Sequence, residues 1–354
     1  MDRDRKILSA PLDITLELTG RCNLRCKHCL SQDSWEGDGE LSTSEWLQLI
    51  EELREIKVFS LFLSGGEPLL REDFFIIMDA LSKFPINVRI GTNATLIDNG
   101  MAKRLKKYRA SIQVSLDGAS PETHNAMRGE GSFERAMEGI TALKREAIPF
   151  SLSAIITRLN YQDTEKIVKL GKMIGAKSVK LGHPVFIGMA WRERRRLILS
   201  PEEHREALRM VKRLVREGDG YVQGSYPTLL NMLKDIGESD GLSTLIIPPC
   251  GAGTTKLTIK ADGTVIPCEQ IRDVELGNIR EEGLREIWHN SPYLKPFREP
   301  ISVPLDSIPE CRGCPYIRVC FGNSRCTLRA KIENRSLYCL IPDRDGGFLD
   351  EFIK

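Results

Sequence analysis

The chain has 354 residues, of which 41% are hydrophobic and 28% charged, with 51 Lys and Arg against 49 Asp and Glu. A formal charge of +2 gives no electrostatic basis for nucleic acid or an anionic membrane as a bulk partner. No apolar run approaches the roughly 20 residues that span a bilayer, and no hydrophobic signal core follows the N-terminus, so we expect a cytoplasmic protein.

The first half of the chain alternates short apolar runs with amphipathic stretches. Six runs rich in β-branched residues and Phe predict strands, at 12–18, 58–63, 88–92, 112–116, 150–157 and 178–182. The stretches between them predict helices, at 42–56, 73–83, 98–107, 133–146 and 163–174. Repeated strand–helix units imply parallel strands joined by crossover helices. We therefore predict an α/β fold, either an open sheet or a partial (β/α)6 barrel of the TIM type, over residues 1–191.

The sequence changes character after this region. Residues 192–245 have few strand signals and predict a helical connection. The basic run at 191–196 is interpreted as a solvated helix face, with a patch for a phosphate or an acidic peptide as the alternative. Residues 246–345 combine Pro and Gly with dense cysteine and a hairpin signal at 261–264, which predicts a small domain held by metal. Residues 346–354 form a C-terminal tail.

The ten cysteines favour metal or redox chemistry, because a reducing compartment keeps ordinary cysteines from forming a disulfide framework. They fall into two groups separated by more than two hundred residues, which predicts two sites in two domains. The first group is Cys22, Cys26 and Cys29, and the second is Cys250, Cys268, Cys311, Cys314, Cys320, Cys326 and Cys339.

The first group lies on a loop directly after the first predicted strand, at the edge where α/β barrels place their active sites. Three thiolates on one loop can hold three corners of a 4Fe–4S cluster and leave the fourth iron open to another ligand. A structural zinc site with His28 as its fourth ligand is the alternative. His28 lies between Cys26 and Cys29, however, where its ring would have difficulty converging with both neighbours.

The spacing of these cysteines, with an aromatic ring just before the last, resembles that of the radical S-adenosylmethionine (SAM) enzymes. In that family the open iron chelates the amino and carboxylate groups of SAM, and an electron from the cluster cleaves the sulfonium to methionine and a 5′-deoxyadenosyl radical. The resemblance implies the partial barrel and places His28 at the cofactor.

A Gly-Gly-Glu-Pro segment ends the second predicted strand and resembles the family segment that holds the SAM amino group. It consists of Gly65, Gly66, Glu67 and Pro68. Paired glycines let the backbone approach a ligand closely, and Glu67 offers a carboxylate near a cation. A tight turn is the alternative interpretation.

Three further residues extend the resemblance. Asn93 follows the third strand and Ser115 ends the fourth, in positions that resemble the family's polar contacts to the SAM ribose and carboxylate. Arg128 resembles the arginine that reaches the SAM carboxylate. Helix caps or turns are the alternatives for the first two residues, and a surface salt bridge is the alternative for Arg128.

The second cysteine group resembles the SPASM extension, a C-terminal domain with two auxiliary iron–sulfur clusters. The resemblance assigns Cys311, Cys314, Cys320 and Cys339 to the distal cluster and leaves Cys250, Cys268 and Cys326 for the nearer one. The pattern departs at Ser324, where family members commonly have a cysteine, and Cys326 follows two positions later. Zinc held by paired cysteine knuckles is the alternative for this region.

The nearer cluster lacks a fourth cysteine. Two clusters with four thiolates each need more cysteines than the seven of this group, and residues 251–257 contain none. We therefore expect one iron bound by water, substrate or another non-cysteine group, or a smaller cluster with an unusual ligand. An absent or degenerate nearer cluster is the alternative.

Segments outside the SAM site indicate a subgroup. Residues 29–31, 40–43, 58–59 and 249–253 resemble the maturases of mycofactocin and pyrroloquinoline quinone, which modify ribosomal peptides. The resemblance implies SAM, three iron–sulfur clusters, an electron donor such as flavodoxin or ferredoxin, and radical modification of a peptide or protein side chain. The alternatives are a radical enzyme for a small molecule such as a tetrapyrrole or sugar acid, and a noncatalytic iron–sulfur or zinc protein.

Two expectations concern the substrate. About eleven residues precede the first strand, too few for the winged-helix module with which some peptide-modifying relatives bind a leader sequence, so we expect a separate peptide-recognition protein. The sequence identifies no catalytic acid or base. His183, after the sixth strand, is a candidate for lining the substrate, with a hydrogen-bonded structural histidine as the alternative.

Overall fold

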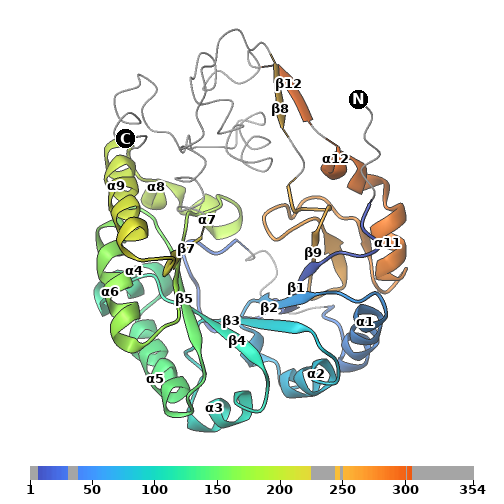
Figure 1. Cartoon of the computed structure of the whole chain (residues 1–354), viewed down its shortest axis with the longest axis horizontal. Coiled ribbons are helices and arrows are strands. Elements are labelled where there is room, and N and C mark those ends of the chain that lie inside the picture. The colour runs from blue at the N-terminus through green and yellow to red at the C-terminus, as the bar shows by residue number, and fades with distance from the viewer. Residues whose placement is uncertain (1–6, 31–38, 225–243, 248–249, 300, 305–354) are drawn as a thin grey trace.

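The computed structural model describes residues 7–30, 39–224, 244–247, 250–299 and 301–304. Six neighbouring strands, each parallel to the next, form the central sheet and curve into an arc (Figure 1). They are β1 (Asp13–Thr19), β2 (Ser60–Gly65), β3 (Asn87–Thr92), β4 (Ala110–Ser115), β5 (Phe150–Ile155) and β6 (Val179–Gly182). The predicted α/β fold with a partial barrel is confirmed.

Helices connect these strands and cover the outer face of the arc. They are α1 (Thr43–Glu55), α2 (Phe74–Leu81), α3 (Asn99–Leu105), α4 (Pro121–Arg128), α5 (Ser132–Arg145) and α6 (Thr164–Ile174), with short 3₁₀ helices η2 (Pro68–Leu70) and η3 (Tyr161–Asp163). The capping box predicted at the start of α1 is present. The Ser42 side chain accepts from Glu45 N, and the Glu45 side chain accepts from Ser42 N. Helix α4 was not predicted, because its eight residues are mostly polar.

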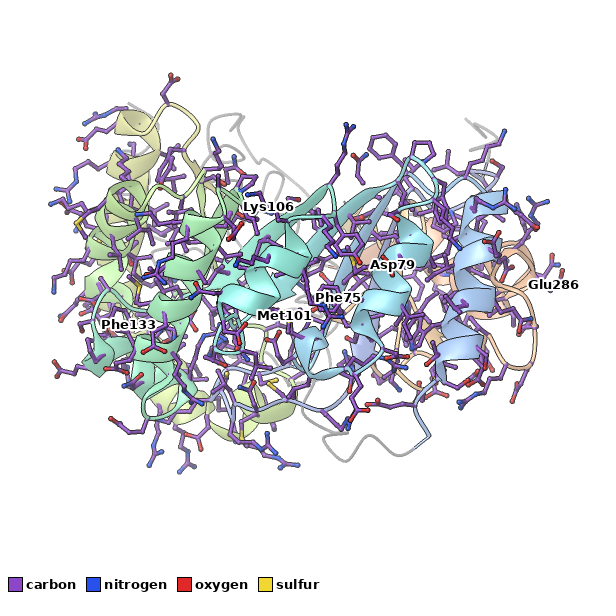
Figure 2. The ribbon with its side chains drawn as sticks, turned by 90° about the horizontal axis from the view of Figure 1, so that it is seen from below. Phe75, Asp79, Met101, Lys106, Phe133 and Glu286 are labelled. Atoms are coloured by element: carbon purple, nitrogen blue, oxygen red, sulfur yellow. The ribbon has the colours of Figure 1, made fainter. Side chains whose placement is uncertain are left out.

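The hydrophobic core lies between the sheet and these helices. Buried residues recur at every second position along most of the strands, and most of them are apolar side chains such as Ile14, Leu16 and Leu63; at the end of β1, residues 16–19 are all buried, Glu17 and Thr19 included. Figure 2 shows Phe75 and Asp79, both of which come from α2. Phe75 stacks on Tyr108, and the Tyr108 hydroxyl donates to Asp79 at 2.6 Å. The inner face of the arc is instead largely polar, whereas closed barrels are filled with branched apolar residues.

The sheet continues past both ends of the six-stranded arc. On one side β7 (Val222–Gln223) pairs in parallel with β6. On the other side β9 (Lys256–Ile259) pairs in parallel with β1 and is followed by the antiparallel strands β10 (Thr264–Ile266) and β11 (Gly277–Asn278). The hairpin predicted at 261–264 therefore joins β9 to β10, and Gly263 adopts the left-handed φ of +86° that its turn requires.

The remaining elements surround the open end of the arc. Helices α7 (Gly188–Arg192), α8 (Arg194–Leu197) and α9 (Pro201–Glu217) follow β6, and α11 (Leu284–Asn290), η4 (Pro292–Leu294) and α12 (Lys295–Arg298) follow β11. β8 (Thr244–Ile247) and β12 (Ile301–Pro304) form a separate antiparallel pair. In the basic run, Arg192, Arg195 and Arg196 are exposed, as a solvated helix face requires. Within the ranges given above, no helix is long and apolar enough to cross a membrane.

Candidate functional site

A cavity of about 270 Å³ opens where the carboxyl ends of the barrel strands meet. Its walls bring together side chains from distant parts of the chain, as sequence analysis predicted. They include Cys22, Cys26, His28, Cys29, Gly65, Gly66, Glu67, Asn93, Ser115 and Arg128. Pro68 lies behind this wall as the buried first residue of η2.

The loop that carries the first cysteine group is fixed at two points. The Asn23 side chain accepts a hydrogen bond from Asn93 Nδ2 at 2.9 Å and donates one to Thr95 Oγ1 at 2.8 Å. Lys27 donates from its backbone to Met127 O at 2.9 Å and from Nζ to Ala126 O at 2.6 Å. The cysteine loop is therefore held between the end of β3 and helix α4.

The three thiols interact electrostatically with one another. Burial, opposed by the charge of Arg128, raises the pKa of Cys26 to about 12. Burial also raises the pKa of Cys22, and the neighbouring Cys29 acts in the same direction on both. The thiols of Cys22 and Cys26 thus keep their protons until a cation at the loop favours the thiolates.

The glycines at the end of β2 are required by a close backbone contact. A Cβ atom on Gly66 would lie 2.1 Å from Arg21 O, and one on Gly65, which has a φ of +120°, would lie 2.4 Å from Thr19 O. Gly66 N donates to Thr19 O at 2.7 Å, and Glu67 N donates to Arg21 O at 2.9 Å. These glycines let the turn pack on the cysteine loop, and their predicted role in close approach to a ligand stays a prediction.

Glu67 is buried and joins two strand ends. Its carboxylate accepts hydrogen bonds from Thr92 Oγ1 at 2.7 Å, from Asn93 N at 2.8 Å and from Leu69 N at 3.4 Å. Burial raises the pKa of Glu67 to about 7, and these hydrogen bonds oppose the increase. The group is therefore poised to change charge near neutral pH, inside the cavity wall.

Arg128 forms a buried ion pair beside the cysteines. Its Nε lies 2.5 Å from Asp117 Oδ2, and Asp117 also accepts from Ile155 N at 2.8 Å. The guanidinium also contacts Cys26 Sγ at 3.7 Å and His28 Nε2 at 3.4 Å. Despite its burial, Asp117 has a pKa below the usual value because of the charge of Arg128. The alternative of a surface salt bridge for Arg128 is therefore wrong.

His28 completes this group as a neutral ring. Burial lowers the pKa of His28 to about 4, although Asp117 lies 3.4 Å from its Nε2. Its Nδ1 is buried and has no hydrogen-bond partner among the residues that the structure describes. A buried polar atom of this kind in the wall of a cavity indicates that a bound group is needed to satisfy it.

Comparison with known proteins identifies the family. The model of the radical SAM superfamily matches residues 16–171, and that of an iron–sulfur cluster-binding domain, SPASM, matches residues 250–315. The mycofactocin maturase MftC of Mycobacterium tuberculosis is 32% identical over 322 residues, which cover 89% of this chain and 78% of that protein. This chain belongs to the radical SAM family.

Two further comparisons cover most of this radical SAM chain. The AdoMet-dependent heme synthase of Methanosarcina barkeri is 30% identical over 334 residues, 91% of this chain and 93% of that protein. The crystal structure of Streptococcus suis SuiB bound to precursor peptide SuiA superimposes with a TM-score of 0.70 at 19% identity, covering 96% of this chain and 76% of SuiB. That structural likeness shows the shared fold.

The radical SAM assignment gives the cofactors, which are SAM, a 4Fe–4S cluster and auxiliary iron–sulfur clusters in the SPASM domain, and the placement of the 4Fe–4S cluster at the first cysteine group stays a prediction. Throughout the parts that the structure describes, no three His, Cys, Asp or Glu side chains are placed to hold a single metal ion. A tetrahedral zinc ion draws its sulfur ligands to about 3.8 Å from one another, whereas a 4Fe–4S cubane binds each thiolate at a separate iron. The thiols along one cavity wall, with His28 Nδ1 beside them, fit the cluster and SAM.

The predicted auxiliary ligands are covered only in part. Cys268 is buried and Cys250 is exposed. Cys311, Cys314, Cys320, Cys326 and Cys339 lie outside the residues that the structure describes, so both ligand sets and the missing fourth ligand of the nearer cluster stay predictions. The proposed domain boundaries likewise stay predictions.

Three further residues near the site are His183, Asp117 and Glu17. His183 is not among the residues that line the cavity, and its charge would act on the pKa of His204 of α9. Two residues of the site were missed. One is Asp117, and the other is Glu17, which lines the cavity from β1 and forms a bidentate ion pair with Arg272 at 2.6 and 2.9 Å. The inward polar position of Glu17 in the alternating strand was the available signal.

Proposed function

We propose that this radical SAM enzyme modifies a side chain of a peptide or protein. The observation that carries the proposal is the continuity of one cavity from the three cysteines onto the polar inner face of the sheet. The likeness to the mycofactocin maturase over 89% of the chain supports a peptide substrate. A substrate seated there would lie beside the cofactor and away from bulk water.

Within this proposal, Cys22, Cys26 and Cys29 hold the 4Fe–4S cluster, which supplies the electron for reductive cleavage of SAM. From the cavity wall, Glu67 would accept a hydrogen bond from the SAM amino group as a buried acceptor, and Arg128 would pair with the carboxylate. Asn93 and Ser115 offer hydrogen bonds from the ends of β3 and β4. The ion pair with Asp117 keeps the guanidinium of Arg128 in place.

The inner face of the sheet offers the substrate hydrogen-bonding groups. Gln113, Ser115 and Ser153 line the cavity from β4 and β5, and Thr15 lines it from β1. Hydroxyl and amide groups of this kind suit the amides of a peptide, which need hydrogen bonds when they leave water. A separate peptide-recognition protein and an electron donor such as flavodoxin or ferredoxin are the further partners of this proposal.

A small-molecule substrate is the second candidate, because the heme synthase relative matches 91% of this chain. The deciding experiment incubates the reduced holoenzyme anaerobically with SAM and with either the short peptides encoded beside its gene or an iron tetrapyrrole. A peptide that stimulates 5′-deoxyadenosine formation and itself changes mass supports the proposal. Turnover of the tetrapyrrole alone would favour the second candidate.

The affinity for SAM is expected to rise about tenfold between about pH 6 and pH 8 through ionisation of Glu67. Burial raises its pKa to about 7, so the carboxyl is mostly protonated at pH 6, and an N–H donor of the bound SAM amino group favours the ionised form. Binding therefore releases a proton below pH 7. Anaerobic calorimetry over this pH range measures the effect.

The Glu67→Gln variant is the control for this pH dependence. It keeps the shape of the side chain and leaves the titration of the SAM amino group unchanged, so it isolates the contribution of Glu67. We expect weaker binding with a flatter pH profile. An unchanged slope in the variant would place the titrating group elsewhere.

A further inference from the structure

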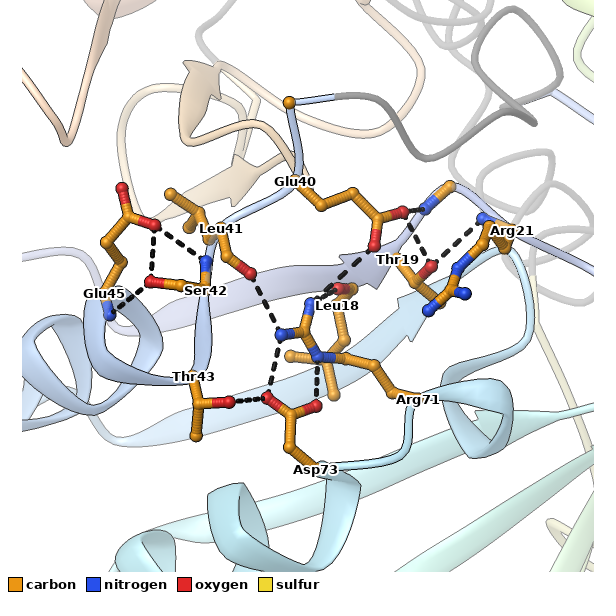
Figure 3. Close-up of polar contacts among 12 residues, drawn as sticks. Leu18, Thr19, Arg21, Glu40, Leu41, Ser42, Thr43, Glu45, Arg71 and Asp73 are labelled. Atoms are coloured by element: carbon orange, nitrogen blue, oxygen red, sulfur yellow. Dashed lines mark hydrogen bonds and ion pairs between the residues drawn. The ribbon is translucent and has the colours of Figure 1, made fainter.

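Residues 40–43, which lead into α1, carry a subgroup resemblance in the sequence but line no part of the cofactor cavity. Glu40 nevertheless binds the backbone that leads to the cysteines. Its Oε1 accepts from Thr19 Oγ1 and from Gly20 N, both at 2.7 Å (Figure 3). Arg21 N donates in turn to Thr19 Oγ1 at 3.1 Å. A single carboxylate oxygen therefore fixes the start of the cysteine loop.

Arg71 holds the other side of this carboxylate. Its guanidinium is nearly buried and lies 3.8 Å from Glu40 Oε2. It also donates to Leu18 O at 2.8 Å and to Leu41 O at 2.9 Å (Figure 3). Asp73 accepts from it at 2.6 and 2.9 Å. Because Arg71 directly follows η2, it links the end of β1, the segment before α1 and the segment after the Gly-Gly-Glu-Pro turn.

The turn at Gly65–Glu67 is hydrogen-bonded to the backbone of residues 19–21, which is the segment that Glu40 holds. Gly66 N donates to Thr19 O and Glu67 N donates to Arg21 O. The two backbones are in close contact here, because a Cβ on Gly66 would lie only 2.1 Å from Arg21 O. A shift of residues 19–21 would therefore move the cysteine loop and Glu67 relative to each other.

We propose that Glu40 is a positioning residue, which sets the cysteine loop against the turn at Gly65–Glu67 and thereby sets the affinity for SAM. It acts through hydrogen-bond acceptance by Oε1 and touches neither cofactor itself. The inference rests on the family's cofactors and not on the identity of the substrate. If Glu40 only stabilised the fold, its contribution would come from the ion pair with Arg71.

Two substitutions of Glu40 separate these roles. Glu40→Ala removes the acceptor, and we expect the Kd for SAM of the reconstituted holoenzyme to rise about ten- to hundredfold. The electron paramagnetic resonance spectrum of its reduced cluster should also respond less to added SAM. Glu40→Gln keeps an oxygen acceptor for Thr19 and Gly20 but loses the charge, so we expect a Kd near that of the unsubstituted enzyme.

Asp73→Ala is the matched control. Asp73 pairs with the same arginine, its side chain is 15% exposed against 13% for Glu40, and it does not contact residues 19–21 in the structure. It should lower the unfolding temperature without a comparable change in SAM affinity. Thr19→Val removes the hydroxyl donor at nearly constant volume and should also weaken SAM binding. This variant tests the proposal if Glu40→Ala does not fold.

The comparison of Kd with unfolding temperature decides between the roles. Weak SAM binding in Glu40→Ala and Thr19→Val, with near-normal binding in Glu40→Gln and Asp73→Ala, supports positioning. If Glu40→Gln binds SAM as poorly as Glu40→Ala, or if the loss in every variant follows its loss of stability, the proposal is overturned.

Discussion

Replacing Cys22, Cys26 and Cys29 together by Ala is expected to abolish the formation of 5′-deoxyadenosine from SAM while leaving the fold and the auxiliary iron in place. The three side chains are partly exposed on a loop and belong to none of the hydrophobic clusters of the described residues, so their truncation creates no cavity in the core. The auxiliary cysteines come from a separate segment beyond residue 249.

Anaerobic iron counting and product analysis measure this outcome. The matched control is Cys268→Ala, which removes a predicted auxiliary ligand from the opposite end of the chain. It should lower the iron content and still leave some 5′-deoxyadenosine formation. Formation of 5′-deoxyadenosine above background in the triple variant would contradict the role assigned to the first cysteine group.

Replacing Asp117 by Ala is expected to cost about 3–5 kcal/mol of unfolding free energy, because it leaves the buried Arg128 without its carboxylate partner. The same guanidinium contacts Cys26 and His28, so the loss of its carboxylate partner also disturbs the surroundings of the cysteines. SAM cleavage should therefore be lost as well. Asp117→Asn, which keeps the shape and an acceptor for Ile155 N, should lose less stability but still hold Arg128 poorly.

Asp163→Ala is the control for Asp117. Asp163 is also buried and accepts from Ala119 N and Thr123 Oγ1, but it does not line the cavity. It should lower stability and retain SAM cleavage. Chemical unfolding and anaerobic product assays give the two quantities, and equal loss of cleavage in both variants would show that stability alone explains the Asp117 result.

The strands and the cysteine site could be predicted because their signals are local. Alternation of apolar and polar residues marks β1, and the three cysteines lie within ten residues of its end. The elements that were missed are short. Helix α4 is polar and eight residues long, and β7 has two residues whose pairing with β6 depends on the intervening α9.

The missed contacts of the site are long-range. Arg128 was predicted at the cofactor, but its partner Asp117 becomes evident only when α4 folds back over the end of β4. Glu17 and Arg272 are 255 residues apart in the chain. No local pattern reports such pairs, because the energy that selects them comes from burial in the assembled fold.

The pairing of β9 with β1 limits how the two halves of this enzyme can be recombined. Asp13–Leu16 align with Lys256–Ile259, so one sheet runs from the barrel into the SPASM region. A chimera joined before residue 256 would make β1 pair with a foreign strand, and a mismatch there would leave unpaired backbone groups next to the cysteine loop, a template for aggregation. A junction after β10 keeps the hairpin with the barrel and lets SPASM segments from other family members be exchanged.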